Sequence, residues 1–151
     1  MNVVALAAAI IAMASTDNWT PRWFRGASGQ MRAMEYARLL KQESEAVGLD
    51  PLLVASVVQS ESSWRPRAVG KDGEHGLLQV FPHTCPAIAS HRGAVRCGVE
   101  QLAALRRKCG DPPERWVGAY NWARRGSGGC EAADPGYPAR ILARYERFKP
   151  R

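Results

Sequence analysis

Acidic residues are scarce in this 151-residue chain, in which 14 Asp and Glu stand against 21 Lys and Arg and the formal net charge is +7. The imbalance is concentrated in the second half, since residues 92–151 carry 13 Lys and Arg against 6 Asp and Glu. A basic surface attracts polyanions such as nucleic acid, anionic lipid or an acidic wall polymer. Charge alone does not choose among these partners, and a solvated face that only aids solubility is the plain alternative.

The chain also lacks an apolar run long enough to cross a bilayer as a helix. Its most apolar stretch, residues 3–14, is short, and no Lys or Arg precedes it. The residues Ala12-Met13-Ala14 before Ser15 have the A-x-A pattern of a leader cleavage site. We therefore expect residues 1–14 to be a secretory signal peptide and the protein to be periplasmic or secreted. The alternative is an uncleaved N-terminal helix or membrane tether.

No pair of cysteines has the C-x-x-C spacing, which argues against a zinc site, and we expect neither a metal nor another cofactor. The even number of cysteines behind a leader predicts two disulfide bonds in an oxidising compartment. Three pairings are possible, and closure of short loops favours Cys85–Cys97 with Cys109–Cys130. Buried free thiols are the alternative.

The length suits one domain with a real core, and no internal repeat or low-complexity block is present. We expect residues 15–29 to form an irregular arm and residues 30–151 to form the domain. Apolar spacing, caps and breakers predict a mainly helical fold with at most a small β-hairpin. The expected helices cover residues 30–47, 51–61, 99–109, 111–122 and 137–148, and residues 77–81 are expected to be a strand or an extended turn.

The second of these helices is the most informative. Asp50 is a good N-cap, Pro51 suits the first helical position, and the following residues are apolar on most faces, which predicts a buried helix. Glu61 ends this helix. Burial and the negative end of the helix dipole both favour the protonated form of a carboxyl group, as a general acid requires. A surface residue at a frayed helix end is the plain alternative.

The residues after Glu61 resemble the soluble lytic transglycosylase family of the lysozyme-like superfamily. The resemblance runs from about residue 30 to 148 in the right order and spacing, and it implies an α+β lysozyme-like fold. One departure is Gly70, which stands where serine is frequent. The matching residues are Glu61-Ser62, Trp64, Pro66, Ala68, Gly73, Gly76-Leu77-Leu78-Gln79, Pro82, Thr84, Ala119-Tyr120-Asn121 and Tyr137.

The resemblance implies a peptidoglycan lytic transglycosylase that cleaves the β-1,4 bond between N-acetylmuramic acid and N-acetylglucosamine. Glu61 would be the catalytic acid and base, and the product would carry a 1,6-anhydro ring. Further residues would bind the sugar or the acid, although core packing with a satisfied hydroxyl is an equal alternative for the two tyrosines. These substrate-binding residues are Ser62, Gln79, Tyr120, Asn121 and Tyr137.

Two other functions stay open. A lysozyme-type hydrolase would use Asp72 or Glu74 to position water, although both are expected to be solvated loop residues. A non-catalytic protein that binds wall polymer or nucleic acid would use the basic face, but it needs no buried acid. The expected partner is the glycan strand, with no nucleic acid, and we expect a monomer. The setting would be wall remodelling for a secretion, conjugation or pilus machine, or for a phage.

Overall fold

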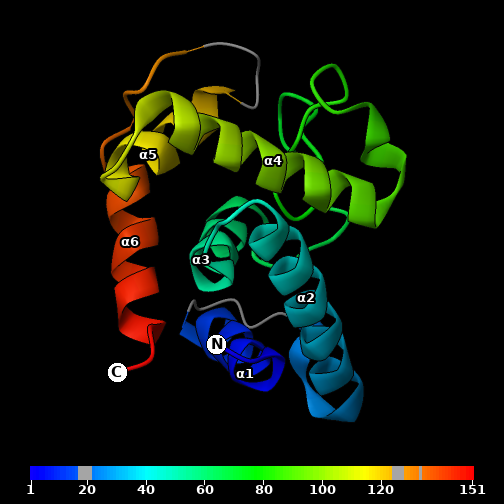
Figure 1. Cartoon of the computed structure of the whole chain (residues 1–151). Helices are drawn as coiled ribbons and strands as arrows, with labels where there is room; N and C mark the ends of the chain where they lie inside the picture. The colour runs from blue at the N-terminus through cyan, green and yellow to red at the C-terminus, as the bar shows by residue number, and fades with distance from the viewer. Residues whose placement is uncertain (17–21, 124–127, 133) are drawn as a thin grey trace.

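Helix α3 (Pro51–Ser62) lies at the centre of the molecule, and other helices surround it (Figure 1). The computed structural model describes residues 1–16, 22–123, 128–132 and 134–151. α3 begins as predicted, because the Asp50 side chain accepts a hydrogen bond from the backbone N–H of Leu52 at 2.8 Å and Pro51 follows the cap. Nine of its 12 residues are buried, which confirms the prediction of a buried central helix.

The surrounding elements make the described part of the chain a single, mainly helical domain, as predicted. α1, α2 and α6 contact α3 directly, and α5 packs against α4 and α6. In Figure 1, α2 and α6 flank α3, α1 lies below it and α4 crosses above it. These helices are α1 (Val3–Thr16), α2 (Gly26–Ala46), α4 (His91–Cys109), α5 (Pro113–Ala123) and α6 (Gly136–Phe148), with 3-10 helices at Arg22–Phe24 and Pro86–Ala89.

Two helices begin earlier than the sequence pattern predicted. α4 starts at His91 rather than residue 99, because Ser90 caps it by accepting from the N–H of Gly93 at 3.1 Å. α2 starts at Gly26 rather than residue 30. Residues 22–29, which were expected to be irregular, thus include a 3-10 helix and the start of α2, while residues 17–21 lie outside the described part. The Phe24 ring meets the Trp64 ring edge-on, with centroids 6.0 Å apart, which holds the segment before α2 against the loop that follows α3.

The segment between α3 and the second 3-10 helix forms turns rather than a sheet. Within the described ranges, the only β-type pairing is two isolated antiparallel bridges, Val69 with His75 and His75 with Val80. Backbone hydrogen bonds in both directions join His75 and Val80 at 2.9 and 3.0 Å. Residues 77–81 are thus an extended turn, and the predicted small hairpin is reduced to these bridges.

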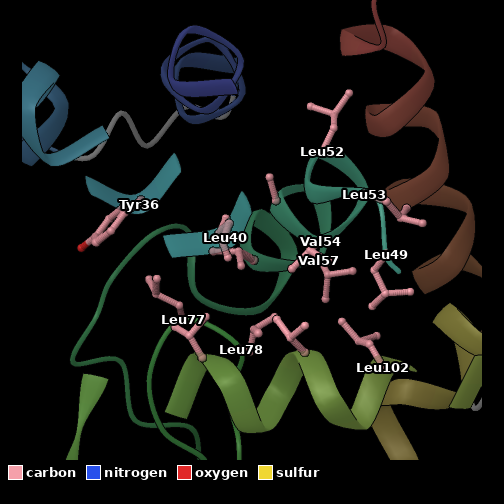
Figure 2. Packing of buried hydrophobic residues seen from close by; sticks show 14 of the residues in the cluster. Tyr36, Leu40, Leu49, Leu52, Leu53, Val54, Val57, Leu77, Leu78 and Leu102 are labelled. Atoms are coloured by element: carbon pink, nitrogen blue, oxygen red, sulfur yellow. The ribbon is translucent and has the colours of Figure 1, made fainter. Parts of the chain in front are cut away.

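The core lies where α3, α4 and the turn at residues 77–78 meet (Figure 2). In Figure 2, the side chain of Leu78 lies between α3 and α4. Gly98 makes this approach possible, because a Cβ atom there would stand only 2.7 Å from the Leu78 Cβ. The missing side chain on α4 therefore determines how deeply the turn enters the core.

The N-terminal apolar stretch forms α1 and packs on the domain. Leu6, Ile10 and Met13 are fully buried and belong to the same core as α3. In the described part of the chain, no helix combines the length and the apolar character that crossing a membrane requires. The division into residues 1–14, 15–29 and 30–151 stays a prediction.

Two disulfide bonds are present, Cys85–Cys97 and Cys109–Cys130, which is the pairing that short-loop closure favours. The first joins the segment before the second 3-10 helix to α4, with Cα atoms 6.0 Å apart. The second joins the last residue of α4 to the segment before α6, with Cα atoms 5.4 Å apart. Both therefore tie α4 to the segments that carry the candidate site residues.

Candidate active site

Glu61 is the penultimate residue of α3, and its side chain is half-buried. The chain turns sharply after it, because Ser63 and Trp64 both adopt left-handed backbone angles, with φ of 50° and 65°. Non-glycine residues rarely occupy this region, so the turn needs support from tertiary contacts. That support determines where the Glu61 carboxyl group lies.

Trp64 supplies the support. It is fully buried, its ring stacks on Tyr36 with centroids 6.0 Å apart, and its Nε1–H donates to Gln59 Oε1 at 2.6 Å. Gln59 lies in the last turn of α3, so the indole closes the turn back onto the helix that carries Glu61. Trp64 therefore packs beneath the loop that follows Glu61.

Tyr137, on α6, lies against Glu61, on α3. Its hydroxyl donates a hydrogen bond to Glu61 Oε1, although 76 residues separate the two in sequence. Tyr137 is the second residue of α6, so the position of that helix decides the contact. Among the predicted site residues whose hydrogen bonds are described, Tyr137 and Glu61 are the pair that bond to each other directly.

Three further hydrogen bonds hold α6 antiparallel to α3. Arg144 Nη1 donates to the carbonyl of Ser56 at 2.9 Å and to the hydroxyl of Ser60 at 2.7 Å. At the far end, the Tyr145 hydroxyl donates to the Asp50 carboxylate at 2.8 Å. Burial, and then the bond to Asp50, raise the pKa of Tyr145 to about 12. Sequence reasoning missed Arg144 as a positioning residue, because no local pattern distinguishes it from other arginines.

Gln79 is buried and braces the loop. Its side-chain amide donates to the carbonyls of Ala68 at 3.0 Å and Gly76 at 2.8 Å, and its φ is 50°. Tyr120 is fully buried, and its hydroxyl donates to the carbonyl of Leu78 at 2.7 Å. These bonds place both residues in the support of the loop, and their contact with a sugar stays a prediction.

The other two predicted binding residues, Ser62 and Asn121, directly follow Glu61 and Tyr120 in the sequence. Ser62 is buried, and its hydroxyl donates back to the Val58 carbonyl at 3.3 Å within α3. Asn121 is half-buried next to Tyr120 on α5. Sugar binding by either residue stays a prediction.

Glu74 corrects the expectation of a solvated loop residue. Only 7% of it is exposed, and its Oε2 accepts a hydrogen bond from the backbone N–H of Asp72 at 3.0 Å. Gly70 explains the burial, since a Cβ atom on residue 70 would overlap the Glu74 carboxyl group. The glycine that departs from the family's serine therefore makes room for a carboxylate. Asp72 is exposed, as expected.

No site for a metal ion is apparent in the described ranges, where no three His, Cys, Asp or Glu side chains cluster closely enough to hold one.

Comparison with known proteins finds one family and several relatives. The sequence model of the family described as "Transglycosylase SLT domain" matches residues 38–128. The "Membrane-bound lytic murein transglycosylase C" of Haemophilus influenzae (strain PittGG) is 36% identical over 88 residues, which are 58% of this chain and 21% of that protein.

Proteins of the same name in two other species are also similar. That of Mannheimia succiniciproducens is 41% identical over 54 residues, covering 36% of this chain and 15% of that protein. That of Edwardsiella ictaluri is 40% identical over 53 residues, which are 35% of this chain and 15% of that protein. The chain thus spans about a fifth or less of the length of these curated relatives. Because the family match covers more than half of the chain and includes Glu61, the chain belongs to the transglycosylase SLT domain family.

Proposed function

We propose that this protein is a peptidoglycan lytic transglycosylase with Glu61 as its catalytic acid and base. The observation that carries the proposal is the half-buried Glu61 at the end of a buried helix, held by the hydroxyl of Tyr137. An acid that works alone must be fixed relative to the scissile bond, and this contact together with the Trp64 turn provides that fixation.

In the first step, the Glu61 carboxyl group donates its proton to the glycosidic oxygen, and the bond from that oxygen to C1 of N-acetylmuramic acid breaks. The carbonyl oxygen of the sugar's own N-acetyl group stabilises the positive charge at C1. In the second step, the Glu61 carboxylate takes the proton of the C6 hydroxyl while O6 bonds to C1. The 1,6-anhydro ring closes, Glu61 regains its proton, and no water is consumed.

The test is the digestion of purified sacculi, with mass spectrometry of the products. The wild-type chain should release fragments with 1,6-anhydromuramoyl ends, and Glu61→Gln should release none while unfolding at the same temperature. Glu45→Gln is the matched control, because Glu45 is an exposed carboxylate on α2. Lysis by Glu61→Gln at the wild-type rate would contradict the assignment of Glu61 as the catalytic acid and base.

A lysozyme-type hydrolase is the second candidate. Hydrolysis usually needs a second carboxylate, and Glu74, in the loop after Glu61, is a carboxylate that the Asp72 N–H holds in one place. The same digest separates the two functions, because a hydrolase leaves reducing muramic acid ends. Glu74→Gln would then abolish activity as completely as Glu61→Gln.

The proposal includes a cellular location, the periplasm or the exterior, with residues 1–14 as the leader. Two disulfides support it, since they form and persist in oxidising compartments. We further propose that the enzyme acts as a monomer that opens local gaps in the wall for a secretion, conjugation or pilus machine, or for a phage. Loss of that assembly in a Glu61→Gln strain would support this role, and normal assembly would contradict it.

A further inference from the structure

Glu74, the buried carboxylate of the loop that follows Glu61, closes a turn at residues 70–74 in two ways. Its backbone carbonyl accepts a hydrogen bond from the N–H of Gly70 at 2.8 Å, and its carboxylate oxygen Oε2 accepts one from the N–H of Asp72 at 3.0 Å. Within the same segment, the Gly73 N–H donates to the Gly70 carbonyl at 3.1 Å. We call residues 70–74 the Glu74 turn.

The carboxyl group of Glu74 lies where a side chain on residue 70 would begin. The three heavy atoms nearest to the place of a Cβ atom on Gly70 all belong to the Glu74 side chain, with Cδ at 1.9 Å and Oε1 at 2.0 Å. Gly70 does not have the left-handed backbone angle that favours glycine, whereas Gly73 does, with a φ of 90°. Glycine at position 70 therefore provides space rather than conformational freedom.

Backbone hydrogen bonds connect the base of the Glu74 turn to the residues next to Glu61. The Arg65 N–H donates to the carbonyl of Ser62 at 3.1 Å, and the Ala68 N–H donates to the carbonyl of Arg65 at 3.2 Å. Beyond the turn, the Gly76 N–H donates to the carbonyl of Ala68 at 2.9 Å. These bonds fix the path of the chain from the end of α3 into the turn and out of it.

Gln79 ties the Glu74 turn to the predicted binding residues. Its side-chain amide donates to the carbonyls of Ala68 and Gly76, which lie on the two sides of the turn in the sequence. Gln79 can therefore make both bonds only while the turn holds these two carbonyls together.

We propose that Glu74 is a positioning residue, whose carboxylate takes the place of a side chain on residue 70 and holds the Glu74 turn, and with it Gln79, in the conformation that the reaction requires. This inference rests on the proposed function, in which Glu61 works without a second carboxylate. The positioning role needs an oxygen that accepts the Asp72 N–H, and it does not need a charge. A second carboxylate that acts in catalysis would need the charge.

The test compares the rates at which Glu74→Gln and Glu74→Ala digest purified sacculi. Glutamine keeps an acceptor oxygen, so its rate should stay within about threefold of wild type. Alanine removes the acceptor, so its rate should fall about tenfold as the turn and Gln79 lose their positions. Loss of activity in Glu74→Gln as complete as in Glu61→Gln would overturn the positioning role and point to a catalytic second carboxylate.

An exchange of side chains tests whether residues 70 and 74 share one space. Gly70→Ser alone should displace the Glu74 carboxyl group and slow digestion about tenfold, because a Cβ atom on residue 70 overlaps that group. Gly70→Ser/Glu74→Ala should lose no more activity than either single variant, since only one side chain then occupies the space. Losses that multiply to about a hundredfold would contradict the shared space.

The control is Glu45→Ala, which removes an exposed carboxylate from α2 and should digest sacculi at the wild-type rate. The unfolding temperature of each Glu74 variant should stay within about 5 °C of wild type, because the turn lies outside the helices. A much larger fall for both Glu74 variants would show that Glu74 supports the whole fold rather than the turn, which would also overturn the proposal.

Amide hydrogen exchange separates this inference from the proposed function, because it does not depend on catalysis. Exchange of the Asp72 amide hydrogen, followed by NMR, should be about tenfold faster in Glu74→Ala than in wild type and little changed in Glu74→Gln. An unchanged rate in Glu74→Ala would refute the positioning role even if the enzyme forms anhydro ends. Conversely, a wild-type digest without anhydro ends would refute the proposed function and leave the exchange result intact.

Discussion

Tyr137 shows how one side chain can position the proposed catalytic group, Glu61. Its hydroxyl donates to Glu61, and the rest of α6 is held to α3 at Ser60 and Asp50. The helix thus delivers the hydroxyl to a place that two further contacts determine. A proton donor whose direction is constrained in this way loses less entropy in reaching the transition state.

We predict that Tyr137→Phe lowers kcat/KM by about 10- to 100-fold. The hydroxyl would stabilise the negative charge that Glu61 develops as it gives up its proton, and a hydrogen bond to a charged group contributes about 1.5–3 kcal/mol. Stability should change by less than about 1 kcal/mol, because the site is half-buried and the ring remains. The measurement is the rate of anhydro-end formation, together with urea unfolding.

Tyr145→Phe is the control for this prediction. It removes the same atom from the same helix at the Asp50 end, away from Glu61. Its rate should fall much less than that of Tyr137→Phe, because the Arg144 bonds still hold α6 against α3. Equal rates for all three proteins would show that the Tyr137 hydroxyl does not assist Glu61.

At the scale of the elements, a buried carboxylate joins α2 to α4. Glu43 of α2 is buried and receives Arg92 Nε at 3.2 Å and Arg96 Nε at 2.9 Å from α4. The hydrogen bond from Arg96, the largest cause, together with Arg92 lowers the pKa of Glu43, although burial acts in the opposite direction. This carboxylate therefore joins the helix before α3 to the helix that both disulfides anchor.

The direction of that shift predicts a pH dependence. Because the folded pKa is lowered, the stabilisation is present above the ordinary value of about 4.5 and is lost as the pH falls below it. Glu43→Gln should be less stable than wild type at pH 7 by about 1 kcal/mol, a modest figure because both arginines are half exposed.

Urea unfolding at pH 7, 5, 4 and 3 measures this difference, and the gap between the two proteins should close towards pH 3. Glu45→Gln, which alters an exposed pair with Lys41, should show a small difference at every pH. A gap for Glu43→Gln that stays constant from pH 7 to pH 3 would mean that the charge of Glu43 is not what matters.

At the scale of the whole molecule, α1 contributes residues to the core, although its sequence has the pattern of a signal peptide. Leu6, Ile10 and Met13 are fully buried against the domain, and burial of each such side chain is worth about 1.5–3 kcal/mol. α1 packs against α2, α3 and α6. Its removal would leave apolar surface of those helices in water.

We predict that a chain beginning at Ser15 unfolds several degrees below the chain beginning at Met1, because that apolar surface becomes exposed. It should retain lytic activity, since the bonds described for Glu61, Trp64 and Tyr137 do not involve α1. Thermal unfolding and sacculus digestion measure both effects. N-terminal sequencing of the exported protein should begin at Ser15, and an intact Met1 would contradict the leader proposal.

The sequence by itself determined the features that depend on neighbours along the chain. Asp50 and Pro51 start α3 because a cap and a first-turn proline act within one turn, and the apolar run after them makes the helix buried. Glu61 and the order of motifs after it indicated the family, and short-loop closure favoured the observed disulfides. Ser90 caps α4 and is also a local signal, but the apolar spacing did not indicate it.

Only the tertiary structure decided which polar groups meet. The bond between Tyr137 and Glu61 depends on the register of α6 against α3, and Arg144 sets that register from a position without any local signature. Glu74 is buried because Gly70 leaves space for it, which the spacing of loop residues does not reveal. The physical reason is the same in each case: helix formation responds to residues within a turn, whereas burial and hydrogen-bond partners depend on segments that packing brings together.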